Sequence, residues 1–153
     1  MNVVLINPEI PQNTGNVART CVMTGTALHL AGKLGFSLED RYLRRAGLDY
    51  WPYLNLSCHQ DFDSLLTRYS ERTFYFFSTR GNRCYTEIDY GRGDFLVFGS
   101  ETEGLPLPML EKWDKSILKV PMIQGIDRSL NLSNTVAIVL YEALRQQGFP
   151  GMN

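Results

Sequence analysis

The sequence predicts an α/β fold with a mainly parallel sheet flanked by helices. Short apolar runs alternate with helix-like segments along the 153 residues. Consecutive side chains within each run are apolar, which is typical of strands buried on both faces of a parallel sheet. No linker, repeat or low-complexity stretch interrupts the pattern. We therefore expect a single domain over residues 1–153.

The expected strands are β-branched or aromatic runs that end at turn residues. The first stops at Asn7-Pro8. The full set is residues 3–6, 27–31, 74–77, 95–98 and 117–120. The aromatic stretch Leu48–Leu56 is a candidate for a further strand. His29 lies inside the second strand, and we interpret it as a core or edge histidine because nothing nearby in the sequence would orient it for catalysis.

Helices are expected where a capping side chain precedes an apolar pattern. Asn13 or Thr14 caps the first helix, which runs through Thr24 and ends at Gly25. Ser37 and Asp40 resemble a capping box before a short second helix. This second helix is expected over residues 41–46. The other expected helices are a segment that is capped by Asp61 or Asp63 and runs through Tyr69, residues 109–112, and residues 132–147. The last helix is apolar over most of its first half, so we expect it to be well buried.

Composition excludes several classes of protein. At 44% hydrophobic and 20% charged residues, the chain is an ordinary globular protein with a real core. A net charge of −1 argues against nucleic-acid binding through bulk basicity, but it allows a local basic patch. Three widely spaced cysteines and two histidines form neither a disulfide framework nor a zinc signature. With no signal peptide and no membrane-length apolar run, we expect a cytoplasmic protein without a metal or a membrane contact.

Polar loops follow most of the expected strands, at residues 7–16, 78–83, 99–104 and 122–131. In a parallel sheet these loops gather at one edge, where α/β proteins bind ligands. Standard signatures are absent there. Gly99 and Gly104 have P-loop spacing but lack the Lys-Ser/Thr that follows, and no G-x-G-x-x-G or G-x-S-x-G is present. A cofactor held by backbone groups of several loops remains possible, since the two glycines permit close backbone approach.

The stretch Ile117–Gln147 combines a strand, a polar loop and the last helix. Its loop ends in Ser129-Leu130-Asn131-Leu132-Ser133-Asn134. A helix cap needs only one or two of these four small polar side chains. The other small polar side chains either provide additional caps for the helix or belong to a binding or catalytic surface.

The densest basic cluster consists of Arg41, Arg44 and Arg45. Arg41 and Arg45 are i,i+4 neighbours on the expected short helix. The cluster is either an ordinary solvated face or a patch that contacts phosphates.

Three segments together resemble the SPOUT (trefoil-knotted) RNA methyltransferases, in the branch that methylates the ribose 2′-oxygen. Asn13-Thr-Gly-Asn-Val-Ala-Arg19 is similar to the family's N-x-G-x-x-x-R. Phe98-Gly-Ser-Glu101-Thr-Glu-Gly104-Leu is similar to its F-G-x-E-x-x-G-L. Val120-Pro-Met122, followed by the Ser129–Ser133 segment, is similar to its I-P-M…S-L-N-x-S. Within the family, the chain most resembles single-domain tRNA (cytidine/uridine) 2′-O-methyltransferases that act on the wobble nucleotide, in the anticodon loop. We expect no appended RNA-binding domain.

The resemblance implies a deep trefoil knot formed by the C-terminal segment, a homodimer, and S-adenosylmethionine bound in the knot. Carried over by position, the cofactor contacts are Phe77, Gly99, Val120, Met122, Ser129 and Leu130. Many of these would act through backbone groups, which accounts for the missing side-chain fingerprint. Two copies of the arginine cluster in a dimer would make one extended basic surface despite the low net charge.

Arg19 matches the family's catalytic arginine. A guanidinium stays protonated at ordinary pH and is a poor base. We therefore expect Arg19 to hold the adjacent phosphate and stabilise negative charge developing on the attacking 2′-oxygen. Proton removal would go through phosphate, water or a carboxylate. Glu101 is the candidate carboxylate, with a helix-capping or structural role as the alternative.

The remaining catalytic candidates are Asn13, Ser129, Asn131 and Asn134, whose asparagines would orient loops or ribose. Tyr141 lies two helical turns beyond Asn134 and would pack against RNA or a partner subunit, with core packing as the alternative. The expected function is thus a tRNA wobble-nucleotide 2′-O-methyltransferase. Two alternatives stay open: a related enzyme acting on ribosomal RNA or another tRNA position, and a non-catalytic RNA-binding module.

Overall fold

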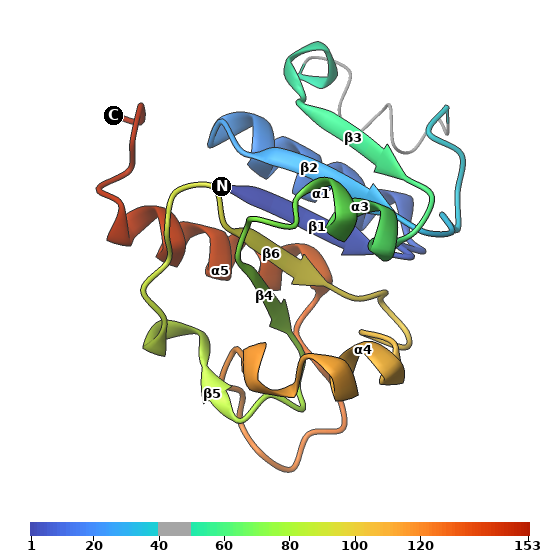
Figure 1. Ribbon diagram of the computed structural model, residues 1–153, viewed down its shortest axis with the longest axis vertical. Coiled ribbons are helices and arrows are strands. Elements are labelled where there is room, and N and C mark those ends of the chain that lie inside the picture. The colour runs from blue at the N-terminus through green and yellow to red at the C-terminus, as the bar shows by residue number, and fades with distance from the viewer. Residues whose placement is uncertain (40–49) are drawn as a thin grey trace.

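The computed structural model describes residues 1–39 and 50–153 (Figure 1). A seven-stranded sheet forms its centre, in the order β3-β2-β1-β6-β4-β7-β5, and every neighbouring pair is parallel. The strands are β1 (Asn2–Ile6), β2 (Ala27–Ala31), β3 (Leu56–His59), β4 (Phe74–Phe77), β5 (Arg83–Cys84), β6 (Phe95–Phe98) and β7 (Ile117–Lys119). The mainly parallel α/β fold predicted from the sequence is confirmed.

Helices cover both faces of the sheet. They are α1 (Pro11–Met23), α3 (Phe62–Arg68), α4 (Leu107–Lys112) and α5 (Leu132–Gln146), with 3-10 turns at Trp51–Tyr53, Tyr85–Glu87 and Asp114–Ser116. On one face, Val3 and Leu5 pack with the apolar side chains of α1 and α5. On the other face, Val4 and Ile6 pack with those of α3 and α4. Alternate residues of β1 thus enter opposite cores, which explains why the whole run is apolar. No helix in the described part of the chain is long and apolar enough to cross a membrane.

Five predicted strands are confirmed, but two strands were missed. The candidate strand at Leu48–Leu56 is wrong, because Trp51–Tyr53 forms a 3-10 turn and the strand begins at Leu56. Its sequence, Leu-Ser-Cys-His, has no continuous apolar run because β3 is an edge strand. β5 has only two residues and also lies at an edge. The predicted helix of residues 41–46 falls outside the described residues.

The start of α1 corrects a prediction. The helix begins at Pro11 with Ile10 at the N-cap position, so neither Asn13 nor Thr14 is the cap. Proline suits the first helical position because its missing N–H would be unpaired there in any case. Asn13 and Thr14 are buried inside the helix. Asp61, in contrast, caps α3 as expected by accepting from the Ser64 N–H.

The position of β7 brings distant segments together. Although β7 follows β6 in the chain, it lies between β4 and β5. The β4–β5 loop must therefore cross the end of β7, and it does so in direct contact. The Ser78 N–H donates to the Leu118 carbonyl at 3.0 Å. A Cβ at Gly81 would lie only 2.5 Å from the Leu118 carbonyl carbon, so only glycine fits this crossing without displacing backbone.

A histidine pair lies on the neighbouring strands β2 and β3, with His29 buried and His59 half-buried. His29 Nε2 is 3.3 Å from Asn2 Oδ1, and His29 Nδ1 is 3.1 Å from His59 Nε2. Because the Asn2 amide nitrogen donates to Gly93, its oxygen is free to accept. The contacts therefore fit a His29 that donates from Nε2 and accepts at Nδ1. The interpretation of His29 as a core histidine is supported, since only 2% of it is exposed.

This pair predicts acid-sensitive stability. Burial, then His59, then the Arg68 charge lower the pKa of His29 from 6.5 to about 4. Between these values the unfolded chain binds more protons, so stability is fully present above pH 6.5 and falls toward pH 4. We expect the free energy of unfolding, measured with urea, to fall by up to a few kcal/mol between pH 6.5 and pH 4. His29→Gln should make this free energy less dependent on pH. Wild-type stability that is constant across the interval would contradict this account.

Candidate functional site

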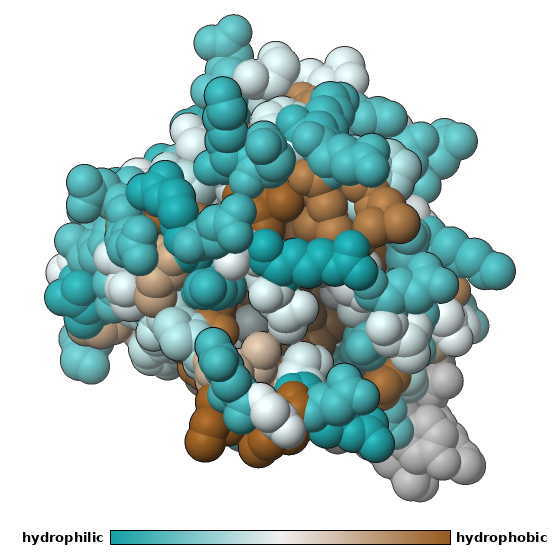
Figure 2. Space-filling model, turned by 90° about the horizontal axis from the view of Figure 1, so that it is seen from below, coloured by the Kyte–Doolittle hydropathy of each residue, from teal (hydrophilic) through white to brown (hydrophobic). Residues whose placement is uncertain are grey.

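A cavity of about 980 Å³ opens where the carboxyl ends of four strands meet. Its walls come from the loops after β1, β4, β6 and β7, with the start of α5. The predicted gathering of these loops is confirmed. Seen from below (Figure 2), this side of the molecule presents apolar patches among polar side chains. The volume is at the upper end of the range for small-molecule and cofactor sites.

The β6–α4 loop forms one wall, and contacts within its backbone set the shape of that wall. Ser100 and Gly104 pair as a short antiparallel bridge, with N–H to carbonyl distances of 3.1 and 3.0 Å. The bridge folds the loop back against Gly99, where a Cβ would overlap the Gly104 carbonyl group. Gly104 has φ of 70°, a conformation that favours glycine. The two glycines of the F-G-x-E-x-x-G-L segment therefore serve one tight turn whose backbone faces the cavity.

The Glu101 carboxylate ties this loop to the start of α1. Oε2 accepts the Glu9 N–H at 2.8 Å, and Oε1 accepts the Ile10 N–H at 3.2 Å. Oε1 also accepts from the Asn13 amide at 3.1 Å. Since Ile10 has no side-chain cap of its own, Glu101 caps α1 from another loop. A carboxylate at a helix N-terminus is also favoured by the helix dipole.

Asn131 extends the connection to α5. Its amide oxygen accepts the Ser133 N–H at 2.9 Å and caps the helix. Its amide nitrogen donates to Asn13 Oδ1 at 2.9 Å. The Asn13 amide nitrogen in turn donates to Glu101, so the side-chain amides of Asn13 and Asn131 both have a defined orientation. We call Asn131, Asn13 and Glu101 the polar relay. It joins three loops that are far apart in the sequence.

A second set of contacts, between Glu9 and Thr102, joins the same two loops beside the relay. The Glu9 carboxylate accepts from the Thr102 hydroxyl at 2.8 Å and from the Thr102 N–H at 3.2 Å. Glu9 and Glu101 thus bind each other's loops reciprocally. Glu9 gave no signal in the sequence, because its partner lies more than 90 positions away.

Arg19 lies on α1 beside Tyr50. Its guanidinium is 5.9 Å from the centre of the Tyr50 ring, within the range of a cation–π contact. The Tyr50 hydroxyl donates to the Gly15 carbonyl at 2.8 Å. Burial raises the pKa of Tyr50, and the Arg19 charge acts in the opposite direction. Arg19 itself is exposed and forms no ion pair with any described residue, so its charge is available to an anionic ligand.

With this geometry, comparison with known families is decisive. Residues 1–141 match the model of the SpoU rRNA methylase family. The chain belongs to this family. It is 48% identical to the tRNA (cytidine(34)-2′-O)-methyltransferase of Burkholderia ambifaria, over 98% of this chain and 97% of that protein.

Two solved structures support the assignment to the SpoU family. One, described as giving structural insights into the 2-OH methylation of C/U34 on tRNA, is 44% identical with a TM-score of 0.90 and covers 96% of this chain and 95% of that chain. The other is an AdoMet-bound rRNA methyltransferase from Sinorhizobium meliloti. It is 25% identical with a TM-score of 0.81, covering 94% of this chain and 55% of that chain.

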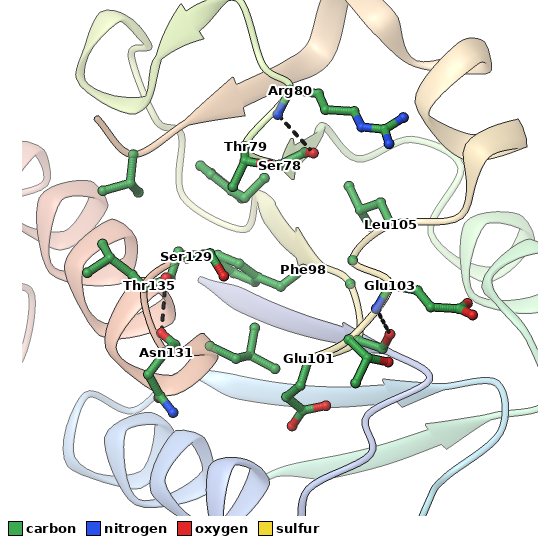
Figure 3. Close-up of a pocket in the computed structure, with 18 of the residues that line it drawn as sticks. Ser78, Thr79, Arg80, Phe98, Glu101, Glu103, Leu105, Ser129, Asn131 and Thr135 are labelled. Carbon is green, nitrogen blue, oxygen red and sulfur yellow. Dashed lines mark hydrogen bonds between the residues drawn. The ribbon is translucent and has the colours of Figure 1, made fainter. Parts of the chain in front are cut away.

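The predicted site residues of this SpoU chain fall into two groups. Those that line the cavity are Phe77, Gly99, Val120, Met122, Ser129 and Leu130 from the cofactor set, and Asn13, Glu101 and Asn131 from the catalytic set (Figure 3). Arg19, Asn134 and Tyr141 do not line it. Asn134 lies in the first turn of α5, where its N–H is 3.4 Å from Asn131 Oδ1. The roles of all these residues stay predictions.

The core-packing alternative for Tyr141 does not hold, because 44% of the residue is exposed. Among the described residues, its ring contacts Phe149, with ring centres 6.4 Å apart. Arg41, Arg44 and Arg45 lie outside the described residues. The two basic residues of the cavity were not assigned any role from the sequence. Arg80 and Arg128 both line the cavity. Their position in the sequence could have indicated a place in the cavity, since each arginine lies in a polar loop that follows a strand.

The relay makes a prediction for Glu101→Gln. The substitution replaces one carboxylate oxygen by an NH₂ group, so one N–H donor of the α1 start loses its acceptor. We expect a loss of about 1–2 kcal/mol in denaturant unfolding, with weaker ligand binding in the cavity. Glu103→Gln is the matched control, because Glu103 is an exposed neighbour whose carboxylate has no hydrogen bond to a described residue. Unchanged stability with abolished turnover would instead identify Glu101 as a proton acceptor.

Proposed function

We propose that this SpoU protein transfers a methyl group from S-adenosylmethionine to the ribose 2′-oxygen of the wobble nucleotide of tRNA, a cytidine or uridine. The observation that carries the proposal is the cavity walled by the Gly99 turn and the polar relay, in a chain matched over its whole length by a tRNA (cytidine(34)-2′-O)-methyltransferase. The tRNA-focused structural relative supports the same substrate.

The cavity residues fit the proposed cofactor. Phe77 and Phe98 stack with ring centres 4.8 Å apart, and with Leu105 they supply apolar surface for an adenine ring. The backbone of the Gly99 turn and of residues 120–130 supplies amide and carbonyl groups for polar atoms. Phe77, Gly99, Val120, Met122, Ser129 and Leu130 would hold the cofactor in this proposal. The family relative from Sinorhizobium meliloti contains the same cofactor.

S-adenosylmethionine supplies an electrophilic methyl group on a sulfonium, so the protein has mainly to position the ribose and handle a proton. Asn13 and Asn131, with orientations set by the relay, border the cavity beside Ser129 and would fix the ribose there. Arg19 would hold a neighbouring phosphate and stabilise negative charge that develops on the 2′-oxygen. Its guanidinium would stay protonated throughout.

The contacts of Glu101 favour its structural alternative over general-base catalysis. Three donors of the protein already occupy its two oxygens, and accepting a substrate proton would break the cap of α1. We therefore assign proton removal to the RNA phosphate or to water, with Glu101 as a positioning residue. Asn134, at the exposed start of α5, would act on the RNA side of the site.

We also propose a homodimer that binds the anticodon loop in the cytoplasm. α1 and α5 lie on the same face of the sheet, and α5 leaves Ile138 and Tyr141 exposed. A partner subunit or RNA would cover them, and the cluster Arg41, Arg44 and Arg45 would extend the basic surface. A single domain with a C-terminal trefoil knot completes the proposal. The crossing of the β4–β5 loop over β7 supports the knot.

Methyl transfer from labelled S-adenosylmethionine into unmodified tRNA tests the function directly. We expect the label in 2′-O-methylcytidine or 2′-O-methyluridine of anticodon fragments, identified by nuclease digestion and nucleoside mass spectrometry. Arg19→Ala should lower turnover by at least ~100-fold, because it removes charge stabilisation made in the transition state. Cofactor affinity should be retained, since Arg19 does not line the cavity.

Label found only in ribosomal RNA would show that ribosomal RNA, not tRNA, is the substrate. The family relative from Sinorhizobium meliloti is a methyltransferase of that RNA class. Cofactor binding without label in any RNA would contradict the proposal as it stands. Absence of cofactor binding would favour the non-catalytic RNA-binding module.

A further inference from the structure

Two arginines line the cavity, and their side chains form no ion pair within the part of the chain that the structure describes. Among the described residues that line it, Arg80 and Arg128 are the only basic ones. Both are exposed, and neither forms an ion pair with a described residue. Two carboxylates also line the cavity: Glu101 is engaged by its own three donors, and the exposed Glu103 forms no ion pair with either arginine. The cavity thus has two guanidinium groups whose charge no described carboxylate balances.

The backbone that carries Arg80 is held firmly. The Arg80 N–H donates to the Ser78 hydroxyl at 3.2 Å, and the Gly81 N–H donates to the Ser78 carbonyl at 3.1 Å. This turn is also the one that crosses β7, where Ser78 binds Leu118 and Gly81 has no room for a side chain. Arg128 lies in the loop that leaves the same strand. Arg80 therefore lies on a fixed turn, beside the loop that carries Arg128.

Arg80 lies across the cavity from the polar relay. Figure 3 places Arg80 at one end and Glu101 and Asn131 at the other. Arg19 lies on α1, the helix whose first turn carries Asn13, and it does not line the cavity. Arg80 therefore lies on the side of the cavity away from Asn13 and the helix that carries Arg19.

The ligand chemistry follows from this arrangement. A nucleotide within a strand has one phosphate on each side of its ribose, and the proposed function assigns Arg19 to one of them. We propose that Arg80 and Arg128 form an anion subsite for the phosphate on the other side of the acceptor ribose. The inference rests on the proposed function. Exposed guanidinium groups bind phosphates in a fork geometry, and a chain of net charge −1 must bind a polyanion through such local cations.

The test compares Arg80→Gln, Arg128→Gln and the double variant with Arg92→Gln. Arg92 is also exposed and unpaired among the described residues, but it does not line the cavity. The probe is a synthetic tRNA anticodon stem-loop with cytidine at the wobble position, and binding is measured by fluorescence anisotropy at several salt concentrations. Cofactor affinity is measured by calorimetry, and it also reports that each variant is folded.

Each single substitution should weaken RNA binding about 10-fold. The slope of log Kd against log salt should fall by about 0.7 per arginine. Arg92→Gln should bind like wild type, and cofactor affinity should change less than ~2-fold in every variant.

Two results would overturn the subsite. One is unchanged RNA affinity and salt slope in the double variant. The other is weakened cofactor binding with RNA binding intact, which would assign the arginines to the cofactor's carboxylate. Failure of the proposed function is distinguishable, because it appears as wild-type protein that binds RNA and cofactor without methyl transfer.

Discussion

The carboxylate of Glu101 is the group on which the site depends. It caps a helix to which it is not adjacent in sequence, and through Asn13 and Asn131 it reaches the cap of a second helix. Leaving the N–H groups at a helix start without acceptors costs free energy, so the three loops are stabilised only when they are together. The same contacts that complete α1 and α5 therefore assemble the cavity wall, and the amide orientations facing the ligand are set by helix capping.

Close backbone packing shapes two of the loops that line the cavity. Gly99 and Gly81 both lie where a Cβ would meet neighbouring main chain, one at the turn after β6 and one where the β4–β5 loop crosses β7. Backbone groups brought this close present N–H and carbonyl groups to the cavity without help from a side-chain motif. This accounts for a cavity of cofactor size in which none of the standard phosphate or dinucleotide fingerprints is present.

Sequence reasoning predicted the strands that lie in the middle of the sheet, because burial on both faces leaves a continuous apolar run. It failed at β3 and β5, where an edge position removes that signal. It also placed the cap of α1 at Asn13 or Thr14, because local pattern cannot reveal a cap supplied by Glu101 from 91 residues away. Of the predicted site residues, the cofactor set with Asn13, Glu101 and Asn131 lines the cavity, whereas Arg19, Asn134 and Tyr141 do not. The pairing of Asn13 with Asn131 depends on the three-dimensional arrangement of the sheet, and no periodicity in the sequence records it.

The polar relay couples the loops around it and thereby forms the ligand cavity. A double-mutant cycle tests it most directly, combining Asn13→Ala with Asn131→Ser, which retains a capping oxygen but removes the amide donor. The quantity measured is the free energy of S-adenosylmethionine binding. We predict a coupling energy of about 1 kcal/mol between the two positions. Additive effects, with coupling inside a few tenths of a kcal/mol, would contradict the claim and leave the relay as two independent helix caps.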